Sequence, residues 1–412
     1  MALPALRNLD VTPVDQDGRP LLCFGDPEGY VDEQLVLSPH AFFVAAHLDG
    51  QQDVTDIQYA FAQQFGGRLL MAEQVMEVVN LLDEHGFLQS ERFYAIRDGV
   101  QRAFAEAAVR SAYLAGKAYP NDPAELRVFL ERFFTHEDGP GEAIGEVCAE
   151  GAPLRGLIVP HIDFERGGPT YAHGYLRLAR HGKPTTVIIF GVAHTGGPAP
   201  FILTRKAFET PLGLIATNAD IVDRLANACR WDPFEREIVH RAEHSIEFQT
   251  LLLAYLYGSD VLIVPILCGH ASEDPAEDDL PRMPEVARFL EACREVAEPS
   301  ENRVAVIAAA DLSHVGRRFG DAFDIDAAVM GRVEAGDRED LAHVAAVDAD
   351  GWYRSVMRDG NARQVCGLGS IYATLKTIEG SVEHGEMLHY GHGPDPAGGM
   401  VSFAGIAFSA KA

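Results

Sequence analysis

The chain has 412 residues, of which 47% are hydrophobic and 23% charged, and its 34 basic and 61 acidic side chains give a formal net charge of -27. This composition is typical of globular proteins and excludes a largely disordered or collagen-like chain, and the length suffices for two or three domains. Because so negative a surface repels phosphate backbones and anionic lipids, we expect no nucleic acid and no membrane surface as a partner.

The six cysteines are widely separated and form no CxxC pair, which is typical of a reducing compartment. The first twenty residues contain three aspartates and no apolar run, so we expect no signal peptide. The longest apolar stretch, residues 250–269, is interrupted by Gly258-Ser259-Asp260 and is therefore not expected to cross a membrane. These features predict a cytoplasmic protein.

The first regular segment spans residues 37–93. Helical patterns begin after Ser38-Pro39, at Val54 and at Ala72, and Gly86 is expected to end the third helix. Residues 87–94 have the pattern of a short strand or wing, with residues 21–36 as its candidate partner. We therefore predict a small three-helix module with a β element.

A change of composition suggests where the main domain boundary lies. Helical patterns continue at residues 101–116 and 122–135, and residues 137–151 (EDGPGEAIGEVCAEG) have the character of a linker. We therefore predict a small domain at residues 1–98, a helical connector and linker at 99–150, and a larger domain at 151–412.

The larger domain alternates short apolar runs with helical patterns. The apolar runs, at residues 154–159, 186–192, 261–267 and 304–310, resemble strands buried on both faces. Helices are expected at residues 170–180, 218–228, 245–257 and 284–297. This alternation predicts an α/β domain with a largely parallel sheet, and the acidic run at 272–279 is interpreted as a solvated loop.

Three of the apolar runs lead directly into residues that can carry chemistry. His161 follows the first run, His194 the second, and Asp311 with His314 the last. Ligands of open α/β sheets bind outside the carboxyl ends of the strands, so these side chains should meet at one edge. One such histidine would simply occupy a turn, but several half-buried imidazoles in one cleft are costly unless a metal or partner satisfies them.

Two further motifs are candidates for the same edge. Cys366 precedes a helical pattern at residues 371–378, where a helix N-terminus favours a thiolate that could bind metal or act as a nucleophile. The sequence is explained equally well if this cysteine is a small apolar side chain that packs in the core beside glycines. His244 and Glu247 lie one turn apart at the start of another expected helix, which fits either a capping cluster or a binding pair.

Five short segments occur in the order and approximate spacing of one known family: Pro160-His161, Gly191-Val192-Ala193-His194, Glu243-His244-Ser245-Ile246-Glu247, Asp311-Leu312-Ser313-His314 and Val365-Cys366-Gly367. Over residues 151–412 the chain thereby resembles the Memo family, named AmmeMemoRadiSam system protein B in prokaryotes. The resemblance implies a radical SAM protein and an AMMECR-like protein as partners. It also implies a fold similar to class III extradiol dioxygenases, an αβ sandwich built on a mixed sheet.

The same resemblance assigns roles to the candidate residues. It implies His161, His194 and Cys366 as ligands of one transition metal ion, with Asp311 and His314 on the opposite, polar side of the pocket. The tail motif at residues 390–400 (YGHGPDPAGGM) departs from the family pattern and adds His392 as a binding candidate. Thr195 and Ala242 also replace the histidine and aspartate of many members.

The chemistry of the third ligand bears on the metal. Dioxygenases of this fold use two histidines and a carboxylate, whereas this chain offers Cys366 at the third corner. A thiolate favours softer or borderline metals, so Fe(II), Cu and Zn are all expected candidates.

The N-terminal module resembles another family. Leu48-Asp49-Gly50, Val54-Thr55-Asp56-Ile57 and the run from Leu81 to Leu88 resemble the winged-helix fold of PqqD-like proteins, which present peptides to radical SAM enzymes by adding a strand to a sheet edge. A generic helical accessory domain explains the same pattern.

Three functions remain open from the sequence. The first is a metal-dependent redox or oxygen-handling enzyme, with His314 as general acid or base oriented by Asp311. The second is a non-catalytic partner of a radical SAM maturation enzyme, whose pocket holds a peptide or anion. The third is metal-assisted hydrolysis with Zn.

Overall fold

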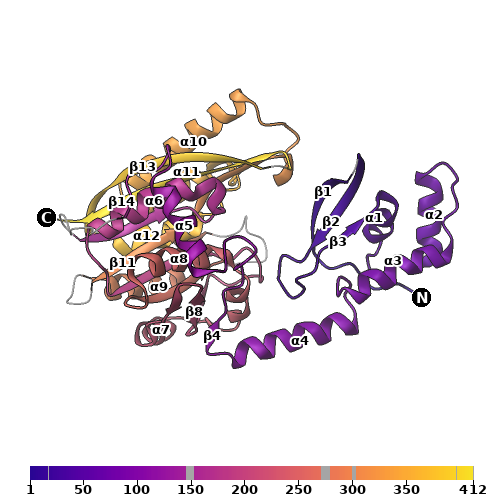
Figure 1. Ribbon diagram of the computed structural model, residues 1–412, viewed down its shortest axis with the longest axis horizontal. Coiled ribbons are helices and arrows are strands. Elements are labelled where there is room, and N and C mark those ends of the chain that lie inside the picture. Colours follow the sequence, from indigo (N-terminus) through magenta and orange to yellow (C-terminus); the bar gives the residue numbers. More distant parts are fainter. Residues whose placement is uncertain (17, 145–152, 271–278, 299–302, 396, 412) are drawn as a thin grey trace. The chain divides into compact units, whose positions relative to one another are not determined.

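The computed structural model describes the chain except for residues 17, 145–152, 271–278, 299–302, 396 and 412 (Figure 1). The described residues form two compact units, Met1–Glu106 and Ala107–Ala412. Residues 145–151 of the expected linker and nearly all of the acidic run at 272–279 lie outside the described residues. Among those described, no helix is both long and apolar enough to cross a bilayer.

The first unit combines a small antiparallel sheet with four helices. Its strands, β1 (Asp10–Gln16), β2 (Arg19–Gly25) and β3 (Leu35–Leu37), pair in that order. Its helices are α1 (Pro39–Ala46), α2 (Val54–Gln64), α3 (Ala72–Glu84) and α4 (Glu91–Glu106). Ser38 caps α1, and Asp53 and Asp56 form a capping box at α2, which confirms the predicted helix starts.

The predicted wing at residues 87–94 is wrong. Leu88 makes only an isolated bridge with Leu6, and helix α4 already begins at Glu91. Gly86 adopts a φ of +68° and ends the preceding helix, after which Phe87 and Leu88 are buried in the core of the unit. Residues 21–36 instead contribute to β2 and β3, and β2 pairs with β1 on one side and with β3 on the other.

The domain boundary lies earlier than the sequence suggested. The predicted helix at 101–116 belongs in part to α4, and the chain enters the second unit at Ala107 through β4 (Val109–Arg110). Helix α5 (Pro123–Phe134) packs on α6 (Phe164–Arg180), where the Phe133 ring occupies the space above Gly168. Residues 107–144 are therefore part of the larger unit rather than a connector.

The second unit is built on a mixed sheet. Its centre consists of the parallel strands β5 (Leu154–Val159), β11 (Val304–Ala309), β6 (Thr186–Val192) and β10 (Leu262–Cys268), in that spatial order. The short strand β7 (Phe201–Leu203) lies antiparallel to β10 at one end. At the other end β14 (Gly399–Ala410) runs antiparallel to β5 and pairs with both β12 (Asp311–Gly316) and β13 (Val382–Asp395).

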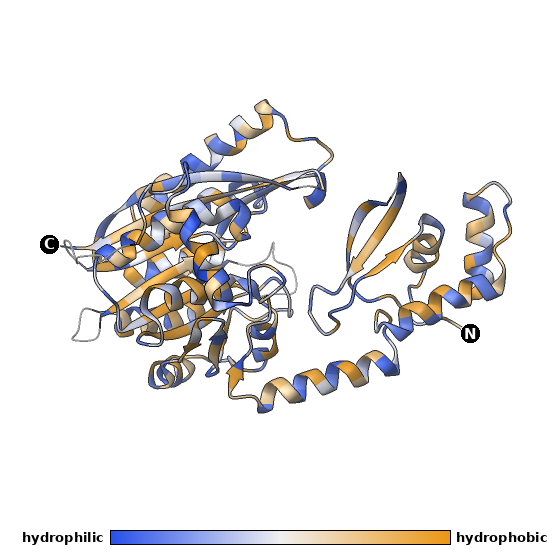
Figure 2. Cartoon of the chain, in the orientation of Figure 1, coloured by the Kyte–Doolittle hydropathy of each residue, from blue (hydrophilic) through white to orange (hydrophobic). Residues whose placement is uncertain are grey.

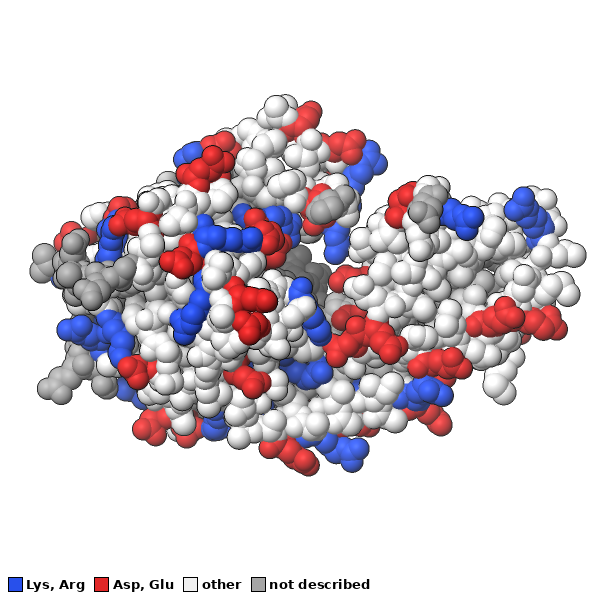
Figure 3. Space-filling model, viewed as in Figure 1, with Lys and Arg blue, Asp and Glu red and all other residues white. Residues whose placement is uncertain are grey.

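The remaining elements of this unit surround the sheet. The helices are α7 (Ala219–Ala226), α8 (His244–Tyr257), α9 (Pro284–Ala297), α10 (Ala327–Ala345), α11 (Ala349–Val356) and α12 (Leu368–Ile378). A second small sheet joins β4, β8 (Ala207–Thr210) and β9 (Gly213–Ile215). On the face drawn in Figure 3, acidic and basic side chains are interspersed, and many exposed arginines pair with neighbouring carboxylates.

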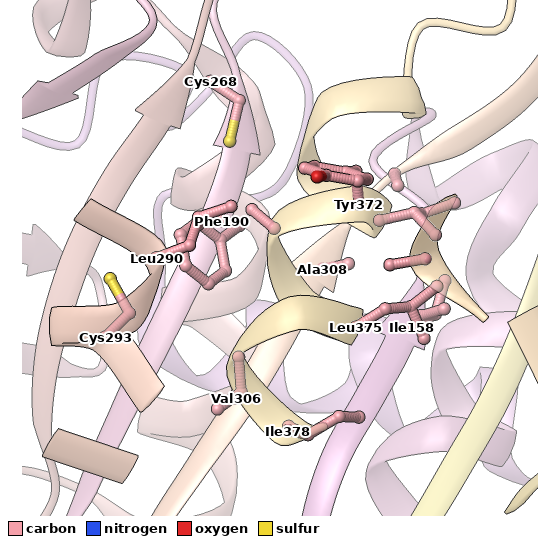
Figure 4. Close-up of a cluster of buried hydrophobic side chains, with 14 of the residues drawn as sticks. Ile158, Phe190, Cys268, Leu290, Cys293, Val306, Ala308, Tyr372, Leu375 and Ile378 are labelled. Atoms are coloured by element: carbon pink, nitrogen blue, oxygen red, sulfur yellow. The ribbon is translucent and has the colours of Figure 1, made fainter. Parts of the chain in front are cut away.

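Alternate side chains of the central strands fill two core layers. Ile158, Phe190 and Val306 belong to a cluster with residues of α9, α11 and α12, part of which Figure 4 shows. Leu157 and Ile189 point to the opposite layer, with residues of α5, α6 and α8. The strands are therefore apolar on both faces, as their colours in Figure 2 show, and the predicted α/β class is confirmed.

Candidate metal centre

The carboxyl ends of adjacent strands bring the candidate residues together. Strand β11 lies between β5 and β6, so the segments that leave these strands emerge side by side. His161 lies two residues beyond the end of β5, and His194 lies two residues beyond β6. Asp311 begins β12 shortly after β11 ends, and Cys366 lies just before α12.

Three of these side chains form a compact donor set. Ligand atoms of His161, His194 and Cys366 all lie within 4.8 Å of one another. The His161 Nε2 atom is 3.3 Å from Cys366 Sγ, and the imidazole rings of His161 and His194 meet edge to face with centroids 5.0 Å apart. Two imidazoles and a thiol at these separations suit a transition metal ion better than they suit a hard cation such as Mg²⁺.

The chain fixes which ring nitrogen each histidine offers. His161 donates its Nδ1–H to the carbonyl oxygen of Ala309 over 2.9 Å, which leaves Nε2 unprotonated beside Cys366. His194 directs Nδ1 to the Glu243 carboxylate, 3.0 Å away, so Nε2 is the nitrogen left for a ligand. Metal-binding histidines generally have their second nitrogen held in this way by a carbonyl or a carboxylate.

Glu243 is a site residue to which the sequence analysis gave no role. Its buried carboxylate accepts hydrogen bonds from the backbone N–H groups of His194 and Ser245, besides contacting the His194 ring. Ser245 in turn bonds both polar backbone groups of Val192 at the end of β6. The start of α8 is thereby fixed against β6, which places Glu243 behind His194.

His244 and Glu247, the two binding candidates of the motif that contains Glu243, have separate roles. His244 lies beside the site, with its ring stacked on that of His194 at a centroid distance of 4.8 Å. Glu247 is buried one turn further along α8, where it pairs with Arg110 and accepts hydrogen bonds from Tyr119 and the backbone of Leu114. Glu247 therefore anchors the first segment of this unit and does not line the cavity, contrary to its expected binding role.

Asp311 is a buried support of the site. One of its carboxylate oxygens accepts hydrogen bonds from the backbone N–H groups of His161 and Ile162, and the other lies 3.5 Å from His161 Nε2. Asp311 lies close to His314, as expected, since both offer ligand atoms within 4.8 Å of each other in a group with Cys366, but no hydrogen bond joins the two side chains among the described residues. The His314 ring instead contacts the Leu312 carbonyl through Nδ1, at 3.1 Å, and meets Phe319 edge to face.

A cavity of about 660 Å³ opens onto the donor set. His194, His314 and Cys366 line it together with His270, Asn361 and Gln364, and its apolar wall includes Leu280, Phe319, Tyr353, Met357 and Leu368. His392 lies elsewhere, exposed on β13, and belongs neither to this lining nor to the donor set. The cavity is large enough for a small organic molecule beside the candidate metal ligands.

Burial and neighbouring charges set the protonation of the donors differently. Burial lowers the pKa of His161 to about 3, so its ring is neutral near pH 7. Burial also opposes the charge on His194, but the Glu243 carboxylate outweighs it and holds the pKa of His194 well above its usual value. Burial raises the pKa of the Cys366 thiol, and it lowers that of His314.

Comparison with known proteins shows which family this chain is similar to. A family model described as Memo-like protein matches residues 110–407. A MEMO1 family protein of Aquifex aeolicus is 28% identical over 385 residues, which cover 93% of this chain and 94% of that protein. A MEMO1 family protein of Methanopyrus kandleri is 33% identical over 305 residues, covering 73% of this chain and 98% of that protein.

The extent of the family match agrees with the structural division of the chain. It begins at Arg110, close to the start of the second unit, and so includes α5, which the sequence analysis had assigned to a connector. It also contains all the residues of the donor set and its supports. The chain belongs to the Memo-like protein family.

Proposed function

We propose that the second unit is a metal-dependent redox or oxygen-handling enzyme whose single transition metal ion is held by His161, His194 and Cys366. The observation that carries this proposal is the pair of hydrogen bonds from the two Nδ1 atoms, which leave the two Nε2 atoms as the nitrogens available beside one sulfur. Without a cation, the buried His161 Nε2 would lie beside a half-buried thiol and a more exposed imidazole at a desolvation cost and with little gain in return.

The donor set narrows the choice of metal. Two imidazoles and a thiolate suit Fe(II), Cu and Zn, and such an ion would supply Lewis acidity and, for Fe or Cu, one-electron chemistry at the cavity wall. The three protein ligands leave room for a further ligand on the side of the cavity. We also propose that the fold is akin to that of class III extradiol dioxygenases, with the cysteine as the main difference in the ligand set.

The residues around the cavity divide the remaining work. Because burial lowers the pKa of His314, its ring is neutral near pH 7 and can accept a proton at Nε2 from a bound molecule. Asn361 and Gln364 offer hydrogen bonds, and the apolar wall holds the body of the substrate.

The first unit supports a second element of the proposal. We propose that it is a PqqD-like module that receives a peptide, and that the protein works with a radical SAM protein and an AMMECR-like protein in the cytoplasm. The outer strands of its three-stranded sheet, β1 and β3, are the candidate edges for such a peptide. The Methanopyrus kandleri relative matches over nearly its whole length but only 73% of this chain, which supports a separable role for the remainder.

Metal analysis after anaerobic purification tests the enzyme proposal. We expect about one transition metal ion per chain in the wild type and a large loss in Cys366→Ser, because the thiolate supplies one of three protein ligands. Cys268→Ala is the matched control, since Cys268 lines the same cavity but belongs to none of the candidate donor groups that the described residues form.

Two results would reject the metal site. One is a wild-type protein that remains metal-free after incubation with Fe(II), Cu(I) and Zn(II). The other is equal metal content in wild type and Cys366→Ser. The pocket would then be better explained as the binding site of a non-catalytic partner protein.

A further inference from the structure

Two buried carboxylates stand behind the loop that carries Cys366. Asp337 and Asp340 lie three residues apart on α10, so they share one face of that helix, and their side chains are 1% and 2% exposed. An unpaired carboxylate at such a depth is very costly. Arg363 pairs with both, and its side chain is itself only 20% exposed.

Further hydrogen bonds tie this cluster to the strands beneath the site. Asp337 accepts hydrogen bonds from the hydroxyl groups of Ser313 on β12, Ser402 on β14 and Tyr390 on β13. The Ser355 hydroxyl on α11 donates to Asp340. The cluster therefore joins six separate segments, namely α10, α11, β12, β13, β14 and the loop that carries Arg363, and Ser313 is the direct neighbour of His314 in the sequence.

Arg363 also belongs to the backbone of the site. Its carbonyl oxygen accepts a hydrogen bond of 2.7 Å from the backbone N–H of His314, and its sequence position is three residues before Cys366. Between them Gln364 adopts a φ of +51°, which is unfavourable for a residue other than glycine and must be held by the surroundings. On the far side of Cys366, the Gly367 N–H bonds the Asp311 carbonyl oxygen over 3.1 Å.

We infer that Arg363, fixed by Asp337 and Asp340, is a positioning residue that holds the Cys366 thiol against His161 and sets the place of His314. The role of Arg363 in metal binding rests on the proposed function, whereas its role in placing Cys366 and His314 rests only on the contacts described above. An arginine suits the task because its planar guanidinium can bond two carboxylates at once, whereas lysine presents a single compact charge. Arg363 acts through Cys366 and does not itself touch the metal.

Cobalt(II) titration of the full-length protein tests this inference. Arg363→Lys should bind Co(II) about 10- to 100-fold more weakly than wild type, as for other groups that orient metal ligands. It should also lose intensity in the thiolate-to-cobalt absorption band. Arg358→Lys is the matched control, because Arg358 pairs with Glu339 of the same helix α10 but is 62% exposed.

A second variant guards against loss of folding. Removing Arg363 alone would leave two buried charges, so Arg363→Met is combined with Asp337→Asn and Asp340→Asn, which leaves no charged side chain at these three positions. Circular dichroism checks that this variant is folded. We expect the same weakened thiolate band, and wild-type affinity with a wild-type spectrum in this variant and in Arg363→Lys would overturn the inference.

Thiol alkylation gives a readout that needs no metal. In the metal-free protein, iodoacetamide should modify Cys366 faster in Arg363→Lys and in the triple variant than in wild type, and peptide mass spectrometry can measure this. Equal alkylation rates would contradict the inference even if no metal binding were detected. Failure of wild type to bind any metal, with faster alkylation in the variants, would reject the proposed function and keep the positioning role.

Discussion

His161 and His194 are held by different partners, and this difference determines how each responds to protons. His161 donates to a backbone carbonyl in buried surroundings and stays neutral near pH 7, because burial lowers its pKa to about 3. His194 contacts the Glu243 carboxylate, which outweighs burial and keeps the pKa of His194 raised. An incoming metal ion must therefore displace a proton from His194 and another from the Cys366 thiol.

We expect metal affinity to rise with pH, since fewer protons then compete for these two ligands. Glu243→Gln removes the charge that raises the pKa of His194, so the slope of log affinity against pH should fall by about one proton per metal ion. Chelator competition across a series of pH values near neutrality measures the slope. Asp348→Asn, which alters the exposed pair with His343, should leave it unchanged, and an equal slope in Glu243→Gln would contradict this account.

A second substitution pair identifies the histidine that binds the metal. Cys366 belongs to two candidate donor groups, one with His161 and His194 and the other with Asp311 and His314. We expect His161→Ala to abolish metal binding and His314→Ala to preserve it, because Nε2 of His161 is the nitrogen turned toward the sulfur. Measuring the metal content of the two purified variants decides between the groups. Loss of metal in His314→Ala with retention in His161→Ala would show that the ion is held by the group of Asp311, His314 and Cys366 instead.

The sequence identified His161, His194, Asp311, His314 and Cys366, but it did not single out Glu243. His161, His194 and Asp311 each come shortly after a strand that was recognisable from its apolar run. In the Glu-His-Ser-Ile-Glu motif, by contrast, local spacing could not tell which carboxylate faces the site. That choice depends on Arg110, a residue distant in the sequence, which pairs with Glu247.

Among the secondary-structure elements, the buried ones were predicted best. Strands β5 and β6 and helix α9 have the bounds expected from their patterns, because continuous apolar runs and a proline at the helix start leave few alternatives. The strand β13 was not predicted, because its sequence (VEHGEMLHYGHGPD) is mostly polar and only two of its residues are buried. Its conformation comes from pairing along β14, which a local pattern cannot reveal.

The start of α12 offers a test of how packing places Cys366. A Cβ on Gly367 would lie 2.5 Å from the Asp311 carbonyl oxygen and 2.7 Å from Ala310 Cβ, where backbone must move. Gly367→Ala should therefore destabilise the protein by about 1–3 kcal/mol, and we expect it to reduce metal occupancy. Thermal unfolding and metal analysis measure both effects.

Gly369→Ala is the control for this substitution. Its added Cβ would meet Cys268 Cβ at 3.6 Å, an ordinary contact, although Gly369 lies in the first turn of the same helix. We expect this variant to retain stability and metal. Equal behaviour of the two alanine variants would show that close packing at Gly367 does not determine the place of the thiol.

At the scale of the whole molecule, the boundary after Glu106 changes which fragment should fold. Helix α5 buries Leu126, Leu130, Phe133 and Phe134 in the core of the second unit, and Arg110 pairs with Glu247 beneath α8. Burial of each large apolar side chain contributes about 1.5–3 kcal/mol to stability. Loss of four such side chains therefore removes an amount comparable to the whole free energy of unfolding of a typical domain, about 5–15 kcal/mol.

We therefore expect a fragment of residues 107–412 to fold cooperatively and bind metal, and a fragment of residues 151–412 to be unfolded or aggregated. Circular dichroism, thermal unfolding and metal analysis of the two purified fragments make the comparison. A stable, metal-binding fragment that begins at residue 151 would restore the boundary expected from composition and contradict the structural role of residues 107–144.

The central claim is that two histidine nitrogens and the Cys366 sulfur hold one metal ion. The most direct test is X-ray absorption spectroscopy of the anaerobically purified protein, recorded at the absorption edge of the bound metal. If the ion is Zn, we expect nitrogen ligands at about 2.0–2.1 Å and one sulfur at about 2.3 Å, with the sulfur lost in Cys366→Ser and kept in Cys268→Ala. A wild-type first shell without sulfur would contradict the account.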